Sequence, residues 1–368
     1  MFRKKRIDVS TASLNRIAWT KFRKNILGFG SLCFIASVTL IACLGYLITP
    51  DQTPFANDQY LELGLKKPGF TVLMLPLSDT GTDKSWIFST MISGKTHTVQ
   101  PVAIRSTRVS GGFRYYVPYG SIPGDANQVG SIPVAGCGEP YRKTFLLGTD
   151  RFGRDYLSQL MIGTRVSLSV GLISVLISLV IGITLGALGG YYRGWVDAVI
   201  MWLINVVWSI PTLLLVIAIT FALGKGFWQV FIAVGLTMWV EVARVVRGQV
   251  LSIREKEFVE AARALGFNDF RIIFRHILPN VMAAVIVISA ANFASAILLE
   301  AGLSFLGLGV QPPTPSWGSM IKENYGYIIL DYAYLAVLPG IVIMMVVLAF
   351  MLMGNALRDA LDVKVSLN

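Results

Sequence analysis

The chain has 368 residues, of which 54% are hydrophobic and 14% charged, and its mean hydropathy is +0.63. Soluble domains carry about 25% charged residues, so this chain has too few charges to cover a water-facing surface. Its net charge of +11 would suit a nucleic-acid binder, but basic grooves with interleaved aromatic residues are absent. The composition therefore excludes a wholly soluble protein, and together with the absence of such grooves it argues against a nucleic-acid partner and indicates a membrane protein in contact with lipid.

Residues 1–25 form a basic segment that we expect on the cytoplasmic side of the membrane. The basic side chains that precede the first apolar block are Arg3, Lys4, Lys5, Arg6, Arg16, Lys21, Arg23 and Lys24. The block that follows, Ile26–Ile48, is long enough to span a membrane. A secretory signal peptide is the alternative interpretation, but the block is too long for a signal core and lacks a clear small-residue cleavage site. We therefore predict a retained helix.

Residues 49–147 are predicted to form an extracytoplasmic insertion. Two runs with β-type composition, Phe70–Leu75 and Phe113–Val117, are separated by Gly and Pro residues. We expect a small β-rich unit that packs on the membrane part or on a partner. Long segments cross the membrane regardless of their charge, so its basic residues do not bear on topology.

Residues 148–357 are predicted to be the main transmembrane domain. Five further apolar blocks bring the expected number of spans to six: Val166–Leu188, Ala198–Leu223, Trp228–Val246, Leu278–Leu299 and Leu335–Met353. The loop at 247–278 is rich in Lys and Arg and is therefore placed in the cytoplasm. Six crossings return the tail, residues 358–368, to the side of the N-terminus. The expected fold is an all-α polytopic membrane protein with a small β-rich insertion.

Two features inside the spans concern helix packing. Gly182, Gly186 and Gly190 recur every four residues on one helical face, and small residues at this spacing let helix backbones approach closely. Pro211 interrupts the third span. We expect a kink there, because proline cannot continue the helical hydrogen bonds, and a hinge used in gating is the alternative.

The cytoplasmic loop between the fourth and fifth spans is the most informative stretch. Residues 254–264 favour a helix, which Gly266 would end by adopting a left-handed cap. A second short helix from Asp269 to His276 would lead into the membrane helix at Pro279. We thus predict a helix roughly parallel to the membrane, held between two spans.

The side chains of this helix suit docking against another protein. Small Ala261 and Ala262 lie beside the charged Glu257 and Glu260. Small residues permit close docking into a groove, while charges fix the register. A solvated connecting helix without a partner is the alternative.

The sequence Glu260-Ala261-Ala262, followed by Gly266 and Leu278-Pro279, resembles the Glu-Ala-Ala loop of permease subunits in ATP-binding-cassette (ABC) importers. In that family this loop is the coupling helix, which sits in a cleft of the ATPase subunit. The residues to which the resemblance gives an ATPase-coupling role are Glu257, Glu260, Ala261, Ala262, Leu265, Gly266, Leu278 and Pro279. His276 departs from the general pattern, which has isoleucine, although the run from His276 to Asn280 (HILPN) resembles the peptide and nickel branch.

Further stretches resemble the dipeptide/oligopeptide/nickel subfamily. LGTDRFGRD at 147–155 is similar to its segment before the second helix, and EAGLSFLGLG at 300–309 with PPTPSWG at 312–318 is similar to its outer loop. The residues that resemble the N-terminal region of its "C"-type partner are Arg16, Trp19, Phe22, Arg23 and Asn25. The insertion is longer than in this pattern, which leaves open how a solute-binding protein docks.

Asp150, Arg151, Arg154 and Asp155 form a compact charged set before the second span. Alternating Asp and Arg residues favour an internal salt-bridge network. An acid pair used in catalysis is the alternative.

Three ionisable residues lie within or near the spans. Glu300, with Ser304, is a candidate substrate-pathway residue, because a charge at membrane depth usually faces a partner or a wet cavity. A structural hydrogen bond in the outer loop is the alternative. Glu241 and Arg244, three residues apart on the fourth span, are expected to pair near the cytoplasmic boundary, with a gating role as the alternative.

The chain contains no Gly-x-x-x-x-Gly-Lys-Ser/Thr loop, and its cysteines and histidines lack metal-ligand spacing. If transport is driven by ATP, the ATP and Mg sites must therefore lie on other subunits. The resemblance implies a type I ABC importer permease fold and a non-catalytic subunit that forms half of a pathway for di- and oligopeptides. It also implies a second homologous permease, two ATPases and an extracytoplasmic solute-binding protein at a bacterial inner membrane.

Other functions remain as alternatives. Nickel or another small solute could be the cargo of the same architecture. An ion-coupled secondary transporter should show an inverted repeat and helices broken at the membrane midplane, and neither is evident in the sequence. A membrane enzyme would need a clustered nucleophile, base or metal site within the spans, and the sequence offers none.

Overall fold

The computed structural model describes residues 14–77, 87–95, 100–122, 129–224 and 226–361. Residues 1–13 of the predicted N-terminal segment and 362–368 of the predicted tail lie outside this set. The chain divides into two compact units. Unit 1 comprises Met1–Val38, Leu168–Gly309 and Val342–Asn368, and unit 2 comprises Thr39–Ser167 and Val310–Ile341.

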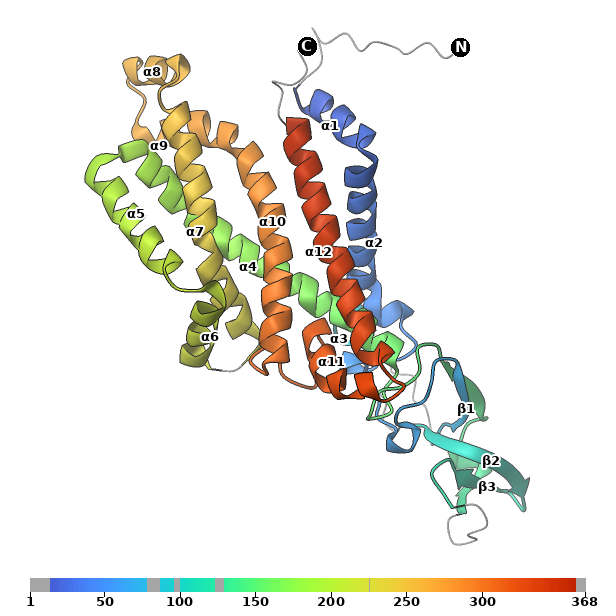
Figure 1. Ribbon diagram of the computed structural model, residues 1–368. Helices are drawn as coiled ribbons and strands as arrows, with labels where there is room; N and C mark the ends of the chain where they lie inside the picture. Colours follow the sequence, from blue (N-terminus) through green and yellow to red (C-terminus); the bar gives the residue numbers. More distant parts are fainter. Residues whose placement is uncertain (1–13, 78–86, 96–99, 123–128, 225, 362–368) are drawn as a thin grey trace, which may run out of the picture. The chain divides into compact units, whose positions relative to one another are not determined.

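Long apolar helices are the main elements of the chain (Figure 1). Within the described residues, the helices long and apolar enough to span a membrane are α2 (Ile26–Ile48), α4 (Tyr156–Tyr192), α7 (Phe227–Ile253), α10 (Leu278–Phe305) and α12 (Tyr334–Leu361). A bent pair, α5 (Gly194–Trp208) and α6 (Thr212–Leu223), makes a sixth span if it is counted as one. The shorter helices are α1 (Leu14–Lys24), α3 (Ile87–Ser93), α8 (Glu257–Ala264), α9 (Asp269–Arg271) and α11 (Trp317–Asn324). The predicted polytopic helical fold is confirmed.

The third predicted span, Ala198–Leu223, is wrong as a single helix. α5 and α6 meet at an angle of 92°. Pro211 has ψ 126°, which is extended rather than helical, and it has no N–H to continue the hydrogen bonds of α5. The chain therefore turns sharply before Thr212, far more than the expected kink. A pair bent in this way has the form of a broken span or of a re-entrant loop, and the sequence predicted neither.

The short helix predicted from Asp269 to His276 is also not separate. Asn268 caps it by accepting a hydrogen bond from the Arg271 N–H at 2.9 Å, and it continues through a π-helical turn, Ile272–Ile277, into α10. Pro279 lies in the first turn of α10, where its missing N–H is tolerated. The side-chain amide of Asn280 donates to the His276 carbonyl at 2.7 Å and so satisfies a backbone acceptor at this junction.

The glycine stripe of α4 lies against the backbone of α7. A Cβ added to Gly186 would lie 2.5 Å from the carbonyl oxygen of Ala243, and one added to Gly190 would lie 2.8 Å from that of Arg247. Gly182, one turn earlier, is equally close to α7. Any side chain at these positions would push the helices apart, so the structure confirms the predicted packing role of the stripe.

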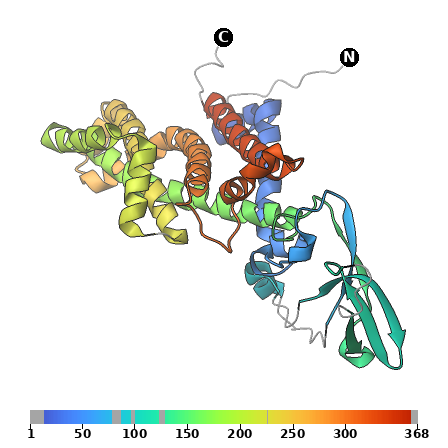
Figure 2. The same cartoon turned by 60° about the horizontal axis from the view of Figure 1, so that its bottom comes forward.

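Unit 2 contains a five-stranded antiparallel sheet (Figure 2). Its strands are β1 (Phe70–Leu75), β2 (Val102–Ser110), β3 (Phe113–Pro118), β4 (Gly130–Pro133) and β5 (Tyr141–Phe145), in the order β4-β3-β2-β1-β5. Leu63, Met74, Ala103 and Phe145 are fully buried in its core. Both predicted β-type runs are strands, and the β-rich insertion is confirmed.

The close approach of α4 and α7 predicts that Gly186→Val destabilises the protein by about 1 to 3 kcal/mol, because a branched side chain must separate the two backbones. The melting temperature of the purified chain in detergent measures this. Gly30→Val is the matched control, since Gly30 is helical and exposed and has nothing within 4 Å of an added Cβ. Equal melting temperatures for the two variants would contradict the packing described here.

Candidate functional site

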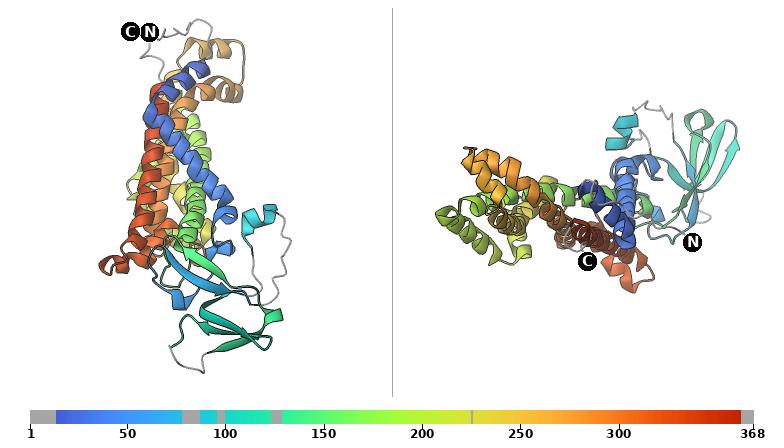
Figure 3. Two further views of the ribbon diagram at one scale, coloured as in Figure 1. Left: turned by 90° about the vertical axis from the view of Figure 1, so that its right-hand side faces the viewer. Right: turned by 90° about the horizontal axis from the view of Figure 1, so that it is seen from above.

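The predicted coupling helix is α8, which lies beyond the ends of α7 and α10 within unit 1 (Figures 1 and 3). It begins at Glu257 rather than at residue 254, because α7 continues to Ile253. Gly266 has a φ of +77°, which confirms the predicted left-handed cap. Its N–H donates to the Arg263 carbonyl at 2.9 Å, and the Phe267 N–H donates to the Ala262 carbonyl at 3.2 Å. These two hydrogen bonds form a Schellman cap and fix the end of α8.

α8 has a buried face and an exposed face. Val259 is 0% exposed and Ala262 is 3% exposed, whereas Glu257, Glu260 and Ala261 are exposed. The buried pair joins an apolar cluster, here called the inner cluster, whose other buried members are Ala187, Tyr191, Val242, Val246, Val250, Ile272, Ile273, Ile277, Leu278, Val281 and Val285. α8 contacts the π-helical turn Ile272–Ile277, and the other members of the cluster come from α4, α7 and α10.

This burial separates the predicted coupling residues into two groups. Ala262 and Leu278 belong to the inner cluster, so they hold α8 on its own chain and are not available to a partner. Glu260, Ala261 and Leu265 face outward. The sequence alone could not separate Ala261 from Ala262, because both are small and adjacent.

Tyr191, at the end of α4, connects this helix to the loop. Its hydroxyl donates to Asp269 Oδ1 at 2.6 Å, and its carbonyl accepts a hydrogen bond from Arg254. The guanidinium groups of Arg254 and Arg263 lie 5.6 and 5.3 Å from the centre of its ring, within cation–π range. Sequence reasoning missed this residue, because a tyrosine at the end of an apolar block gives no signal of its partners.

Two ion pairs brace the same end of unit 1. Arg247 of α7 donates to Asp197 Oδ2 of α5 at 2.6 Å. Arg193 pairs with the exposed Glu255, and its hydrogen bond lowers the pKa of that carboxyl. The helices around α8 are therefore held by polar contacts as well as by the inner cluster.

Large apolar side chains are exposed on α8, at its C-terminal end and on the turns that lead into α10. Phe258 is 44% exposed, Leu265 73%, Phe270 68% and Phe274 55%, and the rings of Phe270 and Phe274 lie 4.3 Å apart. We call these four residues the apolar rim. Apolar surface gathered beside charged groups marks protein docking sites, so the rim and the carboxylates of Glu257 and Glu260 present a surface suited to a partner.

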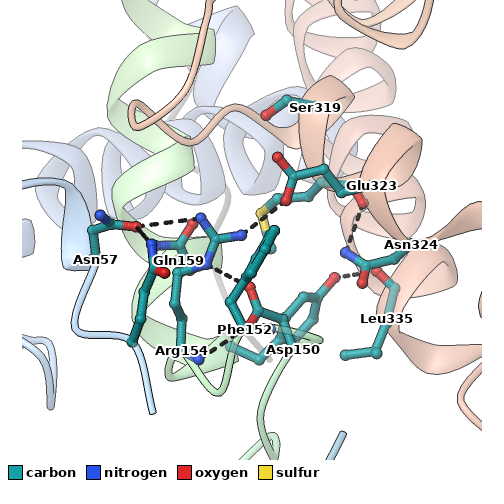
Figure 4. A network of polar contacts seen from close by, with 12 residues as sticks. Asn57, Asp150, Phe152, Arg154, Gln159, Ser319, Glu323, Asn324 and Leu335 are labelled. Atoms are coloured by element: carbon teal, nitrogen blue, oxygen red, sulfur yellow. Dashed lines mark hydrogen bonds and ion pairs between the residues drawn. The ribbon is translucent and has the colours of Figure 1, made fainter. Parts of the chain in front are cut away.

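The charged set before α4 is organised around Arg154 in unit 2 (Figure 4). Its Nε lies 2.6 Å from Asp150 Oδ2, and its Nη2 lies 2.8 Å from Glu323 Oε2 of α11. Asp150 Oδ1 also accepts hydrogen bonds from the backbone N–H groups of Phe152 and Arg154, at 2.9 and 3.0 Å. A buried guanidinium thus joins two carboxylates that are far apart in sequence, and Glu323 could not be foreseen from the local pattern.

The other two members of the charged set do not join this network. Arg151 is exposed, and its guanidinium lies 4.5 Å from the Phe152 ring centre. Asp155 is 2% exposed and caps α4, where Oδ2 accepts from the Ser158 N–H at 3.3 Å and from the Ser158 hydroxyl. Burial raises the pKa of the Asp155 carboxyl above its ordinary 3.8.

Glu300 and Ser304, the candidate substrate-pathway residues, are buried within unit 1. Glu300 is 0% exposed, Ser304 is 2% exposed, and the Ser304 hydroxyl donates to Glu300 Oε1 at 2.7 Å. The chain also turns back closely here, since a Cβ on Gly309 would lie 2.5 Å from Ser304 Cα. This arrangement suits the structural alternative better than contact with a passing solute.

The predicted pair of Glu241 and Arg244 is not formed. Arg244 instead lies over the ring of Trp208, 3.3 Å from its centre, and the five ion pairs found among the described residues do not include Glu241. Glu241 also lies near the middle of α7 rather than at its cytoplasmic end. The ring belongs to a different helix, so spacing along α7 could not show that it competes for the guanidinium.

The apolar helices and the loop that holds α8 together indicate a membrane-spanning subunit. Residues 168–367 match the binding-protein-dependent transport system inner membrane component, and residues 13–68 match the N-terminal transmembrane domain of oligopeptide transport permease C. The first match covers more than half of the chain, so the chain belongs to this family of ABC importer permeases and is a multi-pass membrane protein.

Two relatives show where the chain lies within the family. It is 43% identical over 218 residues to a glutathione transport system permease protein of Pectobacterium atrosepticum, covering 59% of this chain and 72% of the relative. It is 43% identical over 217 residues to a dipeptide transport system permease protein of Alkalihalophilus pseudofirmus, covering 59% and 71%. It is also similar to an inward-facing methionine ABC transporter structure, with 19% identity, a TM-score of 0.47, and coverage of 55% of this chain and 96% of that chain.

The buried network predicts that Arg154→Ala destabilises unit 2 by about 3 kcal/mol, because it leaves two carboxylates without their cation. Hydrogen exchange at Leu65, whose N–H donates to the Asp150 carbonyl, should accelerate. Arg151→Ala is the matched control, because this arginine is exposed. The change in the free energy of unfolding that it causes should stay within about 0.5 kcal/mol. Equal exchange rates in the two variants would refute the structural role of Arg154.

The raised pKa of Asp155 predicts a pH dependence of stability. The folded state favours the protonated Asp155 carboxyl. The contribution of this carboxyl to the stability of the fold is therefore complete below its ordinary pKa of 3.8, and it is lost as pH rises through the higher pKa of the folded state. Asp155→Asn keeps an oxygen acceptor for Ser158 and cannot ionise. Its melting temperature relative to wild type should therefore increase as pH rises from about 4 to about 8. A constant difference over this range would contradict the effect.

Proposed function

We propose that this chain forms half of the translocation pathway of an ATP-driven importer for di- or oligopeptides. The observation that supports this most is α8, a capped helix whose inner face belongs to the same apolar cluster as residues of α4, α7 and α10 and whose outer face offers two carboxylates beside exposed apolar side chains. The peptide cargo is supported by the relatives named for glutathione and dipeptide transport. Nickel or another small solute is the alternative cargo.

The outer face of α8 would sit in a cleft of an ABC ATPase. ATP and Mg would be bound by that partner, because this sequence has no phosphate-binding loop, and the chain itself would catalyse no reaction. Closure of two ATPases on ATP would push on α8, and the inner cluster would pass the movement to α4, α7 and α10. The pathway would thereby alternate between inward-open and outward-open states.

The complete importer would contain further subunits. A second homologous permease would close the pathway, and an extracytoplasmic solute-binding protein would deliver the peptide. The basic residues of the N-terminal segment and of the loop at 247–278 support a cytoplasmic location for both termini at a bacterial inner membrane. The insertion at 49–147 would then lie on the side of the binding protein.

The broken span of α5 and α6 is the observation that favours an ion-coupled secondary transporter, since such transporters use discontinuous helices. Family membership favours the importer. Purification of the tagged chain in mild detergent distinguishes the two: recovery of a second permease and ABC ATPases supports the importer. A chain recovered alone in several detergents would return the secondary transporter to first place.

The exposed carboxylate of Glu260 gives a direct test of coupling. Glu260→Lys reverses the charge in the first turn of α8, so substrate-stimulated ATPase activity of the purified complex should fall at least about tenfold. The variant should still insert into the membrane, because the residue makes no part of the inner cluster. Glu62→Lys, an equal charge reversal at an exposed site of unit 2, is the control. Normal stimulation in Glu260→Lys would rule out this role.

A further inference from the structure

Glu241 places a carboxylate near the middle of helix α7, within the predicted span Trp228–Val246. It lies 14 residues after the start of α7 and 12 before its end, or about 20 Å from each. The side chain is exposed on the surface of the chain, and no hydrogen bond or ion pair reaches it from the residues that the structure describes. A charge at this depth is costly in lipid, so this face of α7 must be covered by a partner or by a wet pathway.

The carboxylate opens on a cavity of about 280 Å³ at the break between α5 and α6. The polar lining consists of Glu241, three hydroxyl groups from Thr212, Thr237 and Ser295, and the indole of Trp208, while the other lining residues are apolar. These side chains come from four helices. A small cavity with few convergent polar groups and apolar walls is the usual form of a small-molecule site.

The charge balance of the cavity selects the kind of ligand. Arg244 lies over the Trp208 ring rather than beside Glu241, and none of the described residues forms an ion pair with the Glu241 carboxylate. A ligand group must therefore be cationic and rich in hydrogen-bond donors. The one cationic group that unmodified peptides share, whatever their side chains, is the amino-terminal ammonium.

The same face of α7 continues past Glu241 toward α8. Val245 and Gln249 follow at steps of four residues, and with Asn280 and Arg358 they line a second cavity of about 470 Å³. Two cavities in succession along one helix face are the arrangement expected of a pathway wall. We propose that this face of α7 lines the pathway and that Glu241 binds the amino-terminal ammonium of the peptide in transit.

This proposal rests on the proposed importer function and is tested with the complete transporter, its ATPases and its binding protein in proteoliposomes. Uptake of trialanine is compared with uptake of Nα-acetyl-trialanine, which lacks the cation. The same binding protein delivers both peptides to every variant, so its own preference cancels when variants are compared. We expect Glu241→Gln to lower trialanine uptake about tenfold, which is equivalent to about 1.4 kcal/mol. The ratio of trialanine uptake to acetyl-trialanine uptake should fall by the same factor.

Two further variants separate recognition from general damage. Glu241→Asp keeps the carboxylate and should recover most of the trialanine uptake. Asp359→Asn removes an exposed carboxylate from the last turn of α12, outside the cavity, and should transport as wild type does.

Several results would overturn the proposal. Wild-type uptake of trialanine by Glu241→Gln would do so, as would equal losses in the Gln and Asp variants. If the binding protein does not deliver the acetylated peptide, the proposal is judged from the trialanine uptake rates of the wild type and the Glu241 variants alone. Loss of the second permease from the Glu241→Gln complex would assign Glu241 to a subunit contact instead. Failure of the importer function is visible separately, because the wild-type complex would then take up neither peptide, and both proposals would fall.

Discussion

The burial of Val259 and Ala262 in the inner cluster is the contact on which the end of unit 1 that holds α8 depends. Protein interiors are packed too densely to be compressed, so a force on the exposed face of α8 is passed on to the helices beneath it. Tyr191 adds a polar connection from α4 to Asp269 on the other side of the loop. α8 is therefore a rigid extension of the membrane helices rather than a flexible linker between them.

Inside the membrane a different constraint holds these helices together. Lipid tails are as apolar as leucine, so burial alone gives no drive for helices to associate. The glycine stripe of α4 compensates by bringing its backbone against that of α7, which multiplies van der Waals contacts. α7 is thus held by α4 along one face and leaves the face with Glu241 open, so the same helix serves as scaffold and as pathway wall.

The features that could be predicted from the sequence are those that depend on neighbouring residues in the chain. Lipid requires long apolar blocks, so the spans were found, and Gly266 could be placed because only a left-handed residue ends α8 in this way. The sequence did not predict what depends on distant residues. Pro211 marks the break of the third span, but a proline in the sequence predicts only a kink and does not give the 92° angle. The stacking of Arg244 on Trp208, the ion pair of Arg154 with Glu323 and the inward face of Ala262 all join segments that are far apart in the chain.

The apolar rim has a consequence for the life of the subunit in the cell. Phe258, Leu265, Phe270 and Phe274 are exposed on this chain, and exposed apolar surface of this kind promotes aggregation. A surplus of this chain over its partner would therefore be prone to aggregation and would be open to chaperones and proteases. The apolar rim, which would contact the ATPase in the assembled importer, would thus also make the cellular amount of this subunit depend on the amount of its partner.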